Sequence, residues 1–319
     1  MNDKEKMRPT ILAEDLVTNR DSAAVVHRIY PVQHSSNPAP GLPQAHLQAR
    51  LSLGFARQEG ATRLVDRNHF GPLLVQKPLY PEGRETCQVV IIHPPGGVVG
   101  GDELELSVRV GISASAQITT PGAAKWYKAN GHVSRQTVTL DVGANGVLEW
   151  VPQETIFFDN VHVELDHHVV LEKEASYIGC EILCFGRTAS GESFTSGQIG
   201  QRTRIYRAGK LIWFDQLRLS GGSAAMKNPL ILASNTVCAT LVAVGKGVPA
   251  TVIEAVREGA GDIAKGVGHL GISQMKSVIT ARYLGNSSET ARRIMLHVWG
   301  LLRPGMLGRE AMVPRMWNT

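Results

Sequence analysis

The sequence predicts a mainly β protein: a large single domain of many short strands in stacked or coiled sheets, with a few C-terminal helices. Two observations lead to this prediction. Apolar and polar residues alternate with a period of two through most of the chain after Ala49, and the period becomes helical only near the end. Residues that favour turns, chiefly Gly and Asn, separate the alternating runs.

The alternating runs are the predicted strands. The first begins at Leu51, and the clearest covers residues 104–110, where Leu and Val alternate with Glu, Ser and Arg. Further runs cover residues 138–142 and 161–165. Because successive side chains of a strand point to opposite faces of a sheet, each run can bury one apolar face. Tight hairpins are predicted across Gly143–Gly146 and Arg207–Lys210.

The helical period is clearest near the C-terminus. Asn286 and Glu289 have the form of a capping box, and apolar residues at helical spacing follow as far as Leu302. Pro304 with Gly305 predicts the end of this helix. Weaker helical patterns cover Thr251–Glu258 and the stretch near Gln274–Tyr283.

Composition divides the chain at about residue 46. Residues 1–46 show no sustained period, and Pro31–Pro43 is rich in Pro, Ser, Asn and Gln, so we expect a flexible N-terminal extension. The remainder, 47–319, is predicted to be one β-rich domain. Hydrophobic residues are 43% of the chain and charged residues 19%, which is enough apolar material for a sizeable core.

The charge distribution favours a protein partner over nucleic acid. The net charge is +5 and the sequence pI is near 9.1, but the basic residues are scattered among Asp and Glu. Nucleic-acid binding needs a clustered basic surface, whereas a dispersed basic surface suits an acidic protein partner.

The sequence predicts a cytoplasmic protein that does not enter a membrane. Met1–Met7 is charged and leads into no apolar segment of a secretory signal. The longest apolar stretch, Leu230–Val244, contains several polar residues and is too short to span a bilayer, so we expect buried strands there. The four cysteines are therefore expected to be reduced, and the spacing of Cys180 and Cys184 does not fit a zinc ribbon.

The run HPPGGVVGGD, His93–Asp102, is the strongest local signal. Its prolines fix backbone angles and its four glycines permit conformations that a side chain would forbid, so it is a shaped loop. His93 and Asp102 offer an imidazole and a carboxylate, both of which bind divalent first-row metals. The alternative is that they hydrogen-bond the loop together. No Gly-Lys-Ser/Thr follows, which excludes a phosphate-binding loop.

Two further segments contain candidate binding residues. TTPGAAKWY places Lys125, Trp126 and Tyr127 after a turn, a combination common in protein interfaces, although core packing explains a single Trp somewhat better. The segment Trp150–Glu172 is dense in carboxylates and imidazoles. On a strand, four of these share one face and could form a row of weak metal sites or a solvated face: His162, Glu164, Asp166 and His168.

No catalytic motif stands out in the chain. It has no Gly-x-Ser-x-Gly elbow and no His-Glu-x-x-His, which argues against a hydrolase. The alternative of a β-rich hydrolase would use the carboxylates of Glu154 and Asp159.

Five segments in order resemble the UreD family of urease accessory proteins, also called UreH. The resemblance runs from about residue 47 to the end, and departs from the family at the N-terminal extension and at His167-His168. The segments are HPPGGVVGGD, TTPGAAKWY, QETIFFDN, GRTASGESFTSG and LRPGMLGREAMVPRMW.

The resemblance implies a maturation factor without turnover of its own. Such a protein binds apo-urease and the accessory proteins F and G, the latter a GTPase, and assists nickel insertion into the dinickel site through an internal conduit. No tightly bound cofactor is implied, only transient Ni²⁺. A pure adaptor without a metal path is the alternative. The expected nickel path uses His93, Asp102, Glu192, His162 and Glu164, and the expected partner surface uses Lys125, Trp126, Tyr127, Arg303, Arg315 and Trp317.

Overall fold

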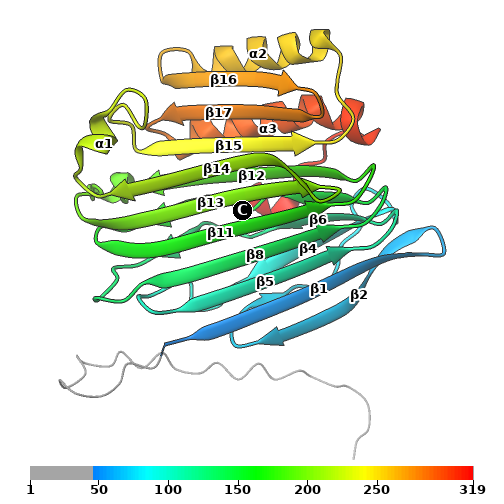
Figure 1. The fold of residues 1–319 in the computed structure, drawn as a ribbon, viewed down its shortest axis with the longest axis horizontal. Helices are drawn as coiled ribbons and strands as arrows, with labels where there is room; N and C mark the ends of the chain where they lie inside the picture. Colours follow the sequence, from blue (N-terminus) through cyan, green and yellow to red (C-terminus); the bar gives the residue numbers. More distant parts are fainter. Residues whose placement is uncertain (1–45, 319) are drawn as a thin grey trace, which may run out of the picture. The chain divides into compact units, whose positions relative to one another are not determined.

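The fold is known from a computed structural model that describes residues 46–318, so the predicted N-terminal extension lies outside the described residues. Two stacked sheets and three α-helices make up this part, which confirms the mainly β prediction (Figure 1). The first sheet has seven strands, in the order β14 (Lys210–Ser220), β13 (Gly197–Arg207), β11 (Val161–Leu171), β8 (Ser134–Val142), β5 (Glu103–Val110), β1 (Gln48–Gln58) and β2 (Ala61–Phe70).

The second sheet has ten strands. Eight follow one path: β16 (Gly268–Met275), β17 (Val278–Gly285), β15 (Val237–Val244), β12 (Ser176–Phe185), β9 (Val147–Trp150), β6 (Ser115–Thr119), β4 (Thr86–Ile92) and β3 (Leu74–Val75). The other two extend from β12, and they are β10 (Thr155–Phe157) and β7 (Ala124–Trp126).

The central strands form a coil that passes back and forth between the two sheets. β5, β8, β11 and β13 pair in parallel in one sheet, while β4, β6, β9 and β12 pair in parallel in the other. Parallel neighbours cannot be joined by a tight turn, so these strands alternate between the two sheets along the chain. This arrangement is solenoid-like, one of the two forms that the sequence predicts.

The predicted hairpin at Gly143–Gly146 is wrong for this reason. Asn145 has a positive φ of 55°, as a turn requires, but the turn leads from β8 in one sheet to β9 in the other. The second prediction is confirmed, because β13 and β14 form an antiparallel hairpin through Ala208 and Gly209.

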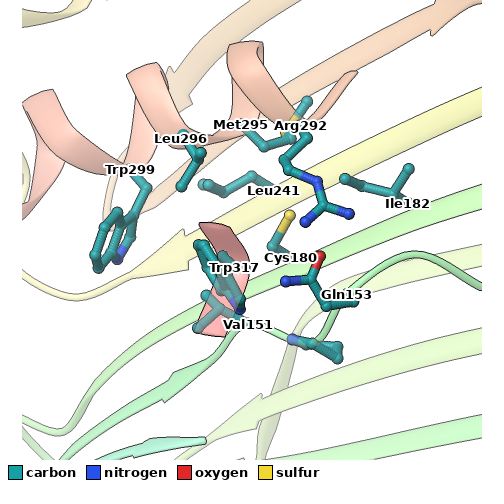
Figure 2. Close-up of a pocket in the computed structure, with 11 residues that line it drawn as sticks. Val151, Gln153, Cys180, Ile182, Leu241, Arg292, Met295, Leu296, Trp299 and Trp317 are labelled. Carbon is teal, nitrogen blue, oxygen red and sulfur yellow. The ribbon is translucent and has the colours of Figure 1, made fainter. Parts of the chain in front are cut away.

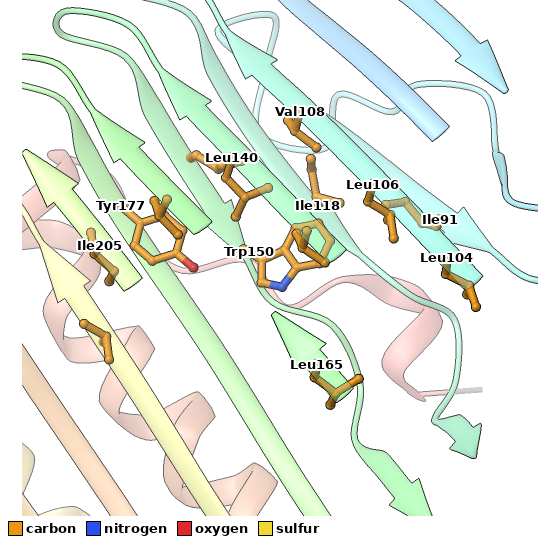
Figure 3. Packing of buried hydrophobic residues seen from close by; sticks show 14 of the residues in the cluster. Ile91, Leu104, Leu106, Val108, Ile118, Leu140, Trp150, Leu165, Tyr177 and Ile205 are labelled. Atoms are coloured by element: carbon orange, nitrogen blue, oxygen red, sulfur yellow. The ribbon is translucent and has the colours of Figure 1, made fainter. Parts of the chain in front are cut away.

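The main core lies between the sheets and follows the predicted alternation. Leu104, Leu106, Val108 and Val110 are all buried, and they meet side chains such as Ile118 and Trp150 from the facing sheet (Figure 3). The inward positions of the other central strands complete this cluster. Because one face of each strand is buried here, the register of the coil is fixed by the apolar pattern.

A second apolar cluster lies between the ten-stranded sheet and helices α2 (Ala250–Ala264) and α3 (Ser288–Leu307). α2 contains the predicted Thr251–Glu258. The cap of α3 is Ser287, whose hydroxyl accepts from the Thr290 N–H at 3.1 Å, whereas the Asn286 side chain accepts from Thr236. α3 continues through Pro304 and ends at Leu307, with Gly308 as its C-cap, so the predicted stop is one turn early.

Two sequence predictions near the C-terminus are wrong. Residues 274–283 are not helical but belong to the β16–β17 hairpin, which turns at Lys276 with a positive φ of 52°. Leu230–Val244 is not all buried strand: Leu230 is 94% exposed after the one-turn helix α1 (Ala224–Lys227), and only β15 is a strand. Short 3₁₀ turns cover Thr188–Ser190 and Arg315–Asn318.

The four cysteines form no disulfide, as expected. Among the described residues, no helix is both long enough and apolar enough to cross a bilayer.

A buried ion pair joins α3 to the ten-stranded sheet. Arg303 and Glu149 are both fully buried, and two guanidinium nitrogens lie 2.9 Å from the two carboxylate oxygens. Trp299 also donates to Glu149 at 2.7 Å, and Glu82 accepts from Arg303 at 2.6 Å. Three polar side chains are aligned across neighbouring strands: Gln88 of β4, Gln117 of β6 and Glu149 of β9. Gln88 donates a hydrogen bond to Gln117.

We expect the Arg303→Met variant to lose about 3–5 kcal/mol of unfolding free energy, because Glu149 would stay buried without its partner. Urea denaturation followed by circular dichroism measures this loss. Arg50→Met is a matched control that breaks an exposed pair with Glu105, at 2.9 Å, and should cost less than about 1 kcal/mol. Equal losses in the two variants would contradict the anchoring role of Arg303.

Candidate functional site

The first four sequence segments that resemble the UreD family meet at one end of the coil. The backbone of Val98 exchanges hydrogen bonds with Lys125 and Tyr127, both at 2.8 Å. β7 pairs with β10, and the Gly186 N–H donates to the Phe157 carbonyl at 2.8 Å. Segments far apart in sequence therefore form one continuous surface, which we call the loop end.

The glycines of the 93–102 loop are required by close packing at the loop end. A Cβ atom on Gly100 would lie 1.6 Å from the Ala129 carbonyl oxygen, and one on Gly97 would lie 2.1 Å from the Tyr127 ring. Neither contact is sterically allowed. Two of the four glycines thus let the loop approach the chain that follows β7.

Asp102 holds this loop in shape. Its carboxylate accepts from the backbone N–H groups of Leu47 and Val99, both at 3.0 Å, and the residue is only 4% exposed. His93 is half-buried, and its Nε2 atom has no hydrogen-bond partner among the described residues. Burial lowers the pKa of His93, against the opposing effect of the Asp102 charge, so its imidazole is neutral and able to bind a metal.

Glu192 is tied into the loop end by three donors. Arg187 donates to it through Nε and a terminal nitrogen, at 3.2 and 2.6 Å, and the Asp159 N–H donates at 3.0 Å. The Arg187 hydrogen bond holds the pKa of Glu192 below its usual value despite partial burial. The Arg187 guanidinium also lies 4.2 Å from the centre of the Phe158 ring, which contacts Tyr127 edge-to-face.

An open groove of about 860 Å³ lies beside these residues. Lys125, Tyr127 and Arg187 line one side, and the start of α3 lines the other. Lys125 is exposed and Tyr127 is half-buried, so both remain available for the proposed partner contact.

Two other residues of the expected partner surface lie in the interior. Trp126 is 1% exposed because β7 turns it into the main core, and Arg303 is fully buried against Glu149. The expectation of a partner contact is therefore corrected for both. Arg315 is exposed, and Trp317 is half-buried with its indole N–H donating to Thr119 at 2.8 Å.

The polar row on β11 lies on the outer face of the seven-stranded sheet. His162 and Glu164 alternate with Val161, Val163 and Leu165, which take the inward positions, so neither residue can line a path between the sheets. Farther along the row, Arg202 and Arg204 hold the Asp166 carboxylate at 2.5 and 2.9 Å. His168 stacks on Tyr206.

Glu154 and Asp159, the carboxylates that the hydrolase alternative would use, bind different parts of the chain. Glu154 forms an ion pair with Arg292. Asp159 accepts from the backbone N–H groups of Thr195 and Ser196, at 2.7 and 2.8 Å. The two carboxylates are thus engaged separately, and the hydrolase alternative gains no support.

The structure reveals a second candidate site, a polar hollow between the sheets at the last turns of the coil. It consists of a cavity of about 30 Å³ and an adjoining open groove of about 590 Å³, and Glu181, Asp215 and Thr240 line both. The cavity is large enough to hold a water molecule. Because the groove is open, the hollow connects the interior with the surface.

Glu181 of β12 is the central carboxylate of the polar hollow. Its only hydrogen bond in the described chain comes from the Gln201 side-chain amide at 2.9 Å, and that amide also donates to Thr203. Burial, and secondarily the negative charge of Asp215, raise the pKa of Glu181 to about 8. This carboxyl group lacks the fixed cation that Glu149 has on the opposite face of the same sheet.

Asp215 and His167 complete the polar hollow. Asp215 of β14 pairs with Arg282 at 2.9 Å, and the Arg282 side chain is half exposed. His167 of β11 faces inward beside Trp150, and burial lowers its pKa to about 4, so the imidazole is neutral. The indole N–H groups of Trp150 and Trp213 also lack hydrogen-bond partners among the described residues. Buried polar groups without a protein partner make the hollow polar and suited to bind water.

Sequence reasoning missed this site, although one signal was present. Glu181 sits at an inward position, between Gly179 and Leu183, and His167 lies between Leu165 and Val169. A titratable residue at a strand position whose neighbours two residues away are apolar and face the core indicates a polar site inside that core.

A smaller apolar cavity lies between α3 and the outer face of β12 (Figure 2). Cys180, Arg292, Trp299 and Trp317 line it. Burial raises the pKa of the Cys180 thiol to about 12, so it is not a thiolate ligand at neutral pH. Over the described residues, no three His, Cys, Asp or Glu side chains converge into a preformed metal cluster.

Comparison with known proteins gives the family. The model of the UreD urease accessory protein family matches residues 47–318. The chain belongs to the UreD family. This is a family of accessory proteins and not of catalytic enzymes, as the five sequence segments predict.

The similarity to individual UreD proteins covers almost their whole length. The chain is 60% identical to the urease accessory protein UreD of Nitrosospira multiformis over 273 residues, which are 86% of this chain and 98% of that one. It is 56% identical to UreD of Janthinobacterium over 272 residues, covering 85% and 92%. UreD of Methylobacillus flagellatus is 43% identical over 272 residues, covering 85% and 94%.

The stability of the protein should depend on pH through Glu181. Its folded pKa of about 8 lies above the ordinary 4.5, so the folded chain keeps a proton that the unfolded chain releases. This stabilisation is fully present below pH 4.5 and is lost as the pH rises through 8. Glu181→Gln should therefore gain unfolding free energy relative to the parent protein as the pH rises through this window, measured by urea denaturation. The exposed Glu105→Gln control should track the parent protein, and a Glu181→Gln profile that also does so would contradict the assignment.

Proposed function

We propose that this protein assists the maturation of urease. In this role it binds apo-urease together with the F- and G-type accessory proteins, and it provides an interior passage for nickel on its way to the dinickel site. Membership of the UreD family supports the role in maturation. The polar hollow is the observation that favours a metal passage over a simple adaptor.

The polar hollow has the chemistry that transit of a divalent cation needs. Asp215 supplies a carboxylate and His167 a neutral imidazole, and the Glu181 carboxyl group becomes a further oxygen donor when a cation displaces its proton; such donors suit Ni²⁺. Each carboxylate has an exchangeable protein partner, the Gln201 amide or the half-exposed Arg282. Sites that bind weakly and exchange their partners let an ion move on, whereas a tight preformed cluster would retain it.

The loop end supports partner binding. Lys125 is exposed beside the 860 Å³ groove, and Tyr127 and Arg187 supply the side-chain types enriched at binding hot spots. Asp102 and Glu192 hold this surface in shape through their backbone and Arg187 contacts. In the proposal they act first by positioning the loops. His93, with a neutral imidazole and an unpaired nitrogen, is the loop-end residue best suited to touch the metal.

The metal passage is tested by activation of urease in a reconstituted mixture. Apo-urease, the F- and G-type proteins, GTP and Ni²⁺ are incubated with the parent protein or with the Glu181→Ala/Asp215→Ala variant. We expect the variant to lose at least about tenfold in urease activation while co-eluting with its partners. Glu105→Ala, at an exposed carboxylate on the outer face, should leave activation unchanged. Full activation by the double variant, with complexes intact, would support the adaptor alternative instead.

Partner binding is tested separately by size-exclusion chromatography at micromolar concentration. The parent protein should co-elute with the F-type protein or with apo-urease, and Lys125→Glu should weaken this association about tenfold, because it reverses a charge at the groove. Lys173→Glu reverses an exposed charge in the turn between β11 and β12 and serves as control. If the parent protein binds neither partner, the maturation role is contradicted.

A further inference from the structure

The edges of the two sheets are protected to different degrees. An exposed edge strand presents unpaired backbone groups that can bind another chain, and proteins usually cover, shorten or charge such edges. In the ten-stranded sheet, β3 has only two residues, and Arg257 of α2 donates to the Ile272 carbonyl of β16 at 3.0 Å. In the seven-stranded sheet, the edge strand β2 carries Arg63, Asp66 and Arg67. Each of these edges has a recognisable protection.

β14 carries charged residues as well, Lys210, Asp215 and Arg218, but unlike β2 it borders the groove of the polar hollow. It is eleven residues long, its only strand neighbour in the described chain is β13, and it contains no proline. Its sequence is rich in residues that favour strands, and two of its large apolar side chains stay exposed, Leu211 at 50% and Phe214 at 52%. A long, apolar edge of this kind is what proteins avoid unless another chain covers it.

Open space borders this edge. The 590 Å³ groove of the polar hollow is lined by Leu217 of β14 on one side and by Leu270 of β16 on the other. Leu230 and Ile231, in the segment after α1, line it as well and are 94% and 40% exposed. The groove therefore offers apolar surface to side chains of a segment placed along β14.

Within the described part of the chain, the groove has one cation without a partner. Arg218 of β14 is exposed and forms no ion pair with any described residue. The carboxylates of the groove lie with their own partners, Asp215 with Arg282 and Glu181 with Gln201. Charge complementarity therefore favours an acidic occupant.

We propose that the free edge of β14 accepts an extended segment of a partner protein as an added strand, with apolar side chains in the groove and an acidic side chain paired with Arg218. This inference rests on the proposed function, because it specifies how one of the partners docks. In strand addition the backbone hydrogen bonds supply affinity, while alternate side chains supply specificity. The added strand would border Asp215 and Glu181, so docking would bring the partner to the opening of the polar hollow.

Hydrogen–deuterium exchange of the full-length protein, alone and in complexes with apo-urease or with the F-type protein, tests the proposal. Backbone pairing should slow exchange across residues 210–220 by at least about tenfold in one of these complexes. Residues 61–70 of the other edge strand, β2, serve as internal comparison and should not change. Leu230→Glu and Arg218→Glu should each raise the dissociation constant of that complex about tenfold. Ile112→Glu, at a residue that is 70% exposed elsewhere, is the matched control.

The outcomes separate this proposal from the proposed function. If complexes form, residues 210–220 exchange as in the free protein and both groove variants bind normally, strand addition is wrong and the maturation role stands. If the parent protein binds neither apo-urease nor the F-type protein, both proposals are wrong. Protection of residues 210–220 together with weakened binding of both variants, but not of Ile112→Glu, supports strand addition.

Discussion

The ion pair between Arg303 and Glu149 is the contact on which the layered arrangement depends. Glu149 projects from the outer face of the ten-stranded sheet, at the end of a row of buried polar side chains, and has no exposure to water. A buried charge without a partner is strongly destabilising, so α3 is stable only where Arg303 reaches it. This pair fixes α3 against the outer face of the ten-stranded sheet. The polar residues between the two sheets are therefore not needed to hold the helices in place.

The two faces of the ten-stranded sheet hold carboxyl groups in opposite ways. On the outer face, Glu149 is locked by a fully buried guanidinium and by the Trp299 indole. On the inner face, Glu181 has one amide partner, and its raised pKa reflects burial without a fixed cation. The first arrangement holds a structure together, while the second leaves a carboxylate able to change partners. This difference is the physical argument for the proposed nickel passage in the polar hollow.

The sequence predicted the fold well wherever one rule of periodicity acted alone. The alternation along 104–110 gave the inward and outward faces of β5, and the helical spacing gave α3. Predictions failed where contacts with the rest of the fold decide the local structure. A turn at Asn145 can lead to a hairpin or to the other sheet, and here it leads to the other sheet. The segment near 274–283 forms a hairpin despite its helical spacing. The candidate residues divide similarly. Likeness to the family's motifs points to Asp102 and Glu192, but Glu181 and Asp215 come from different sheets, and only the folded coil brings them to one hollow.

The most direct test of the account is to locate nickel in crystals of the full chain soaked with Ni²⁺, by anomalous diffraction at the nickel absorption edge. The account predicts an anomalous peak between the sheets, beside the carboxylates of Glu181 and Asp215. Peaks confined to the outer face, for instance at His162 or His168, with none between the sheets, would contradict it.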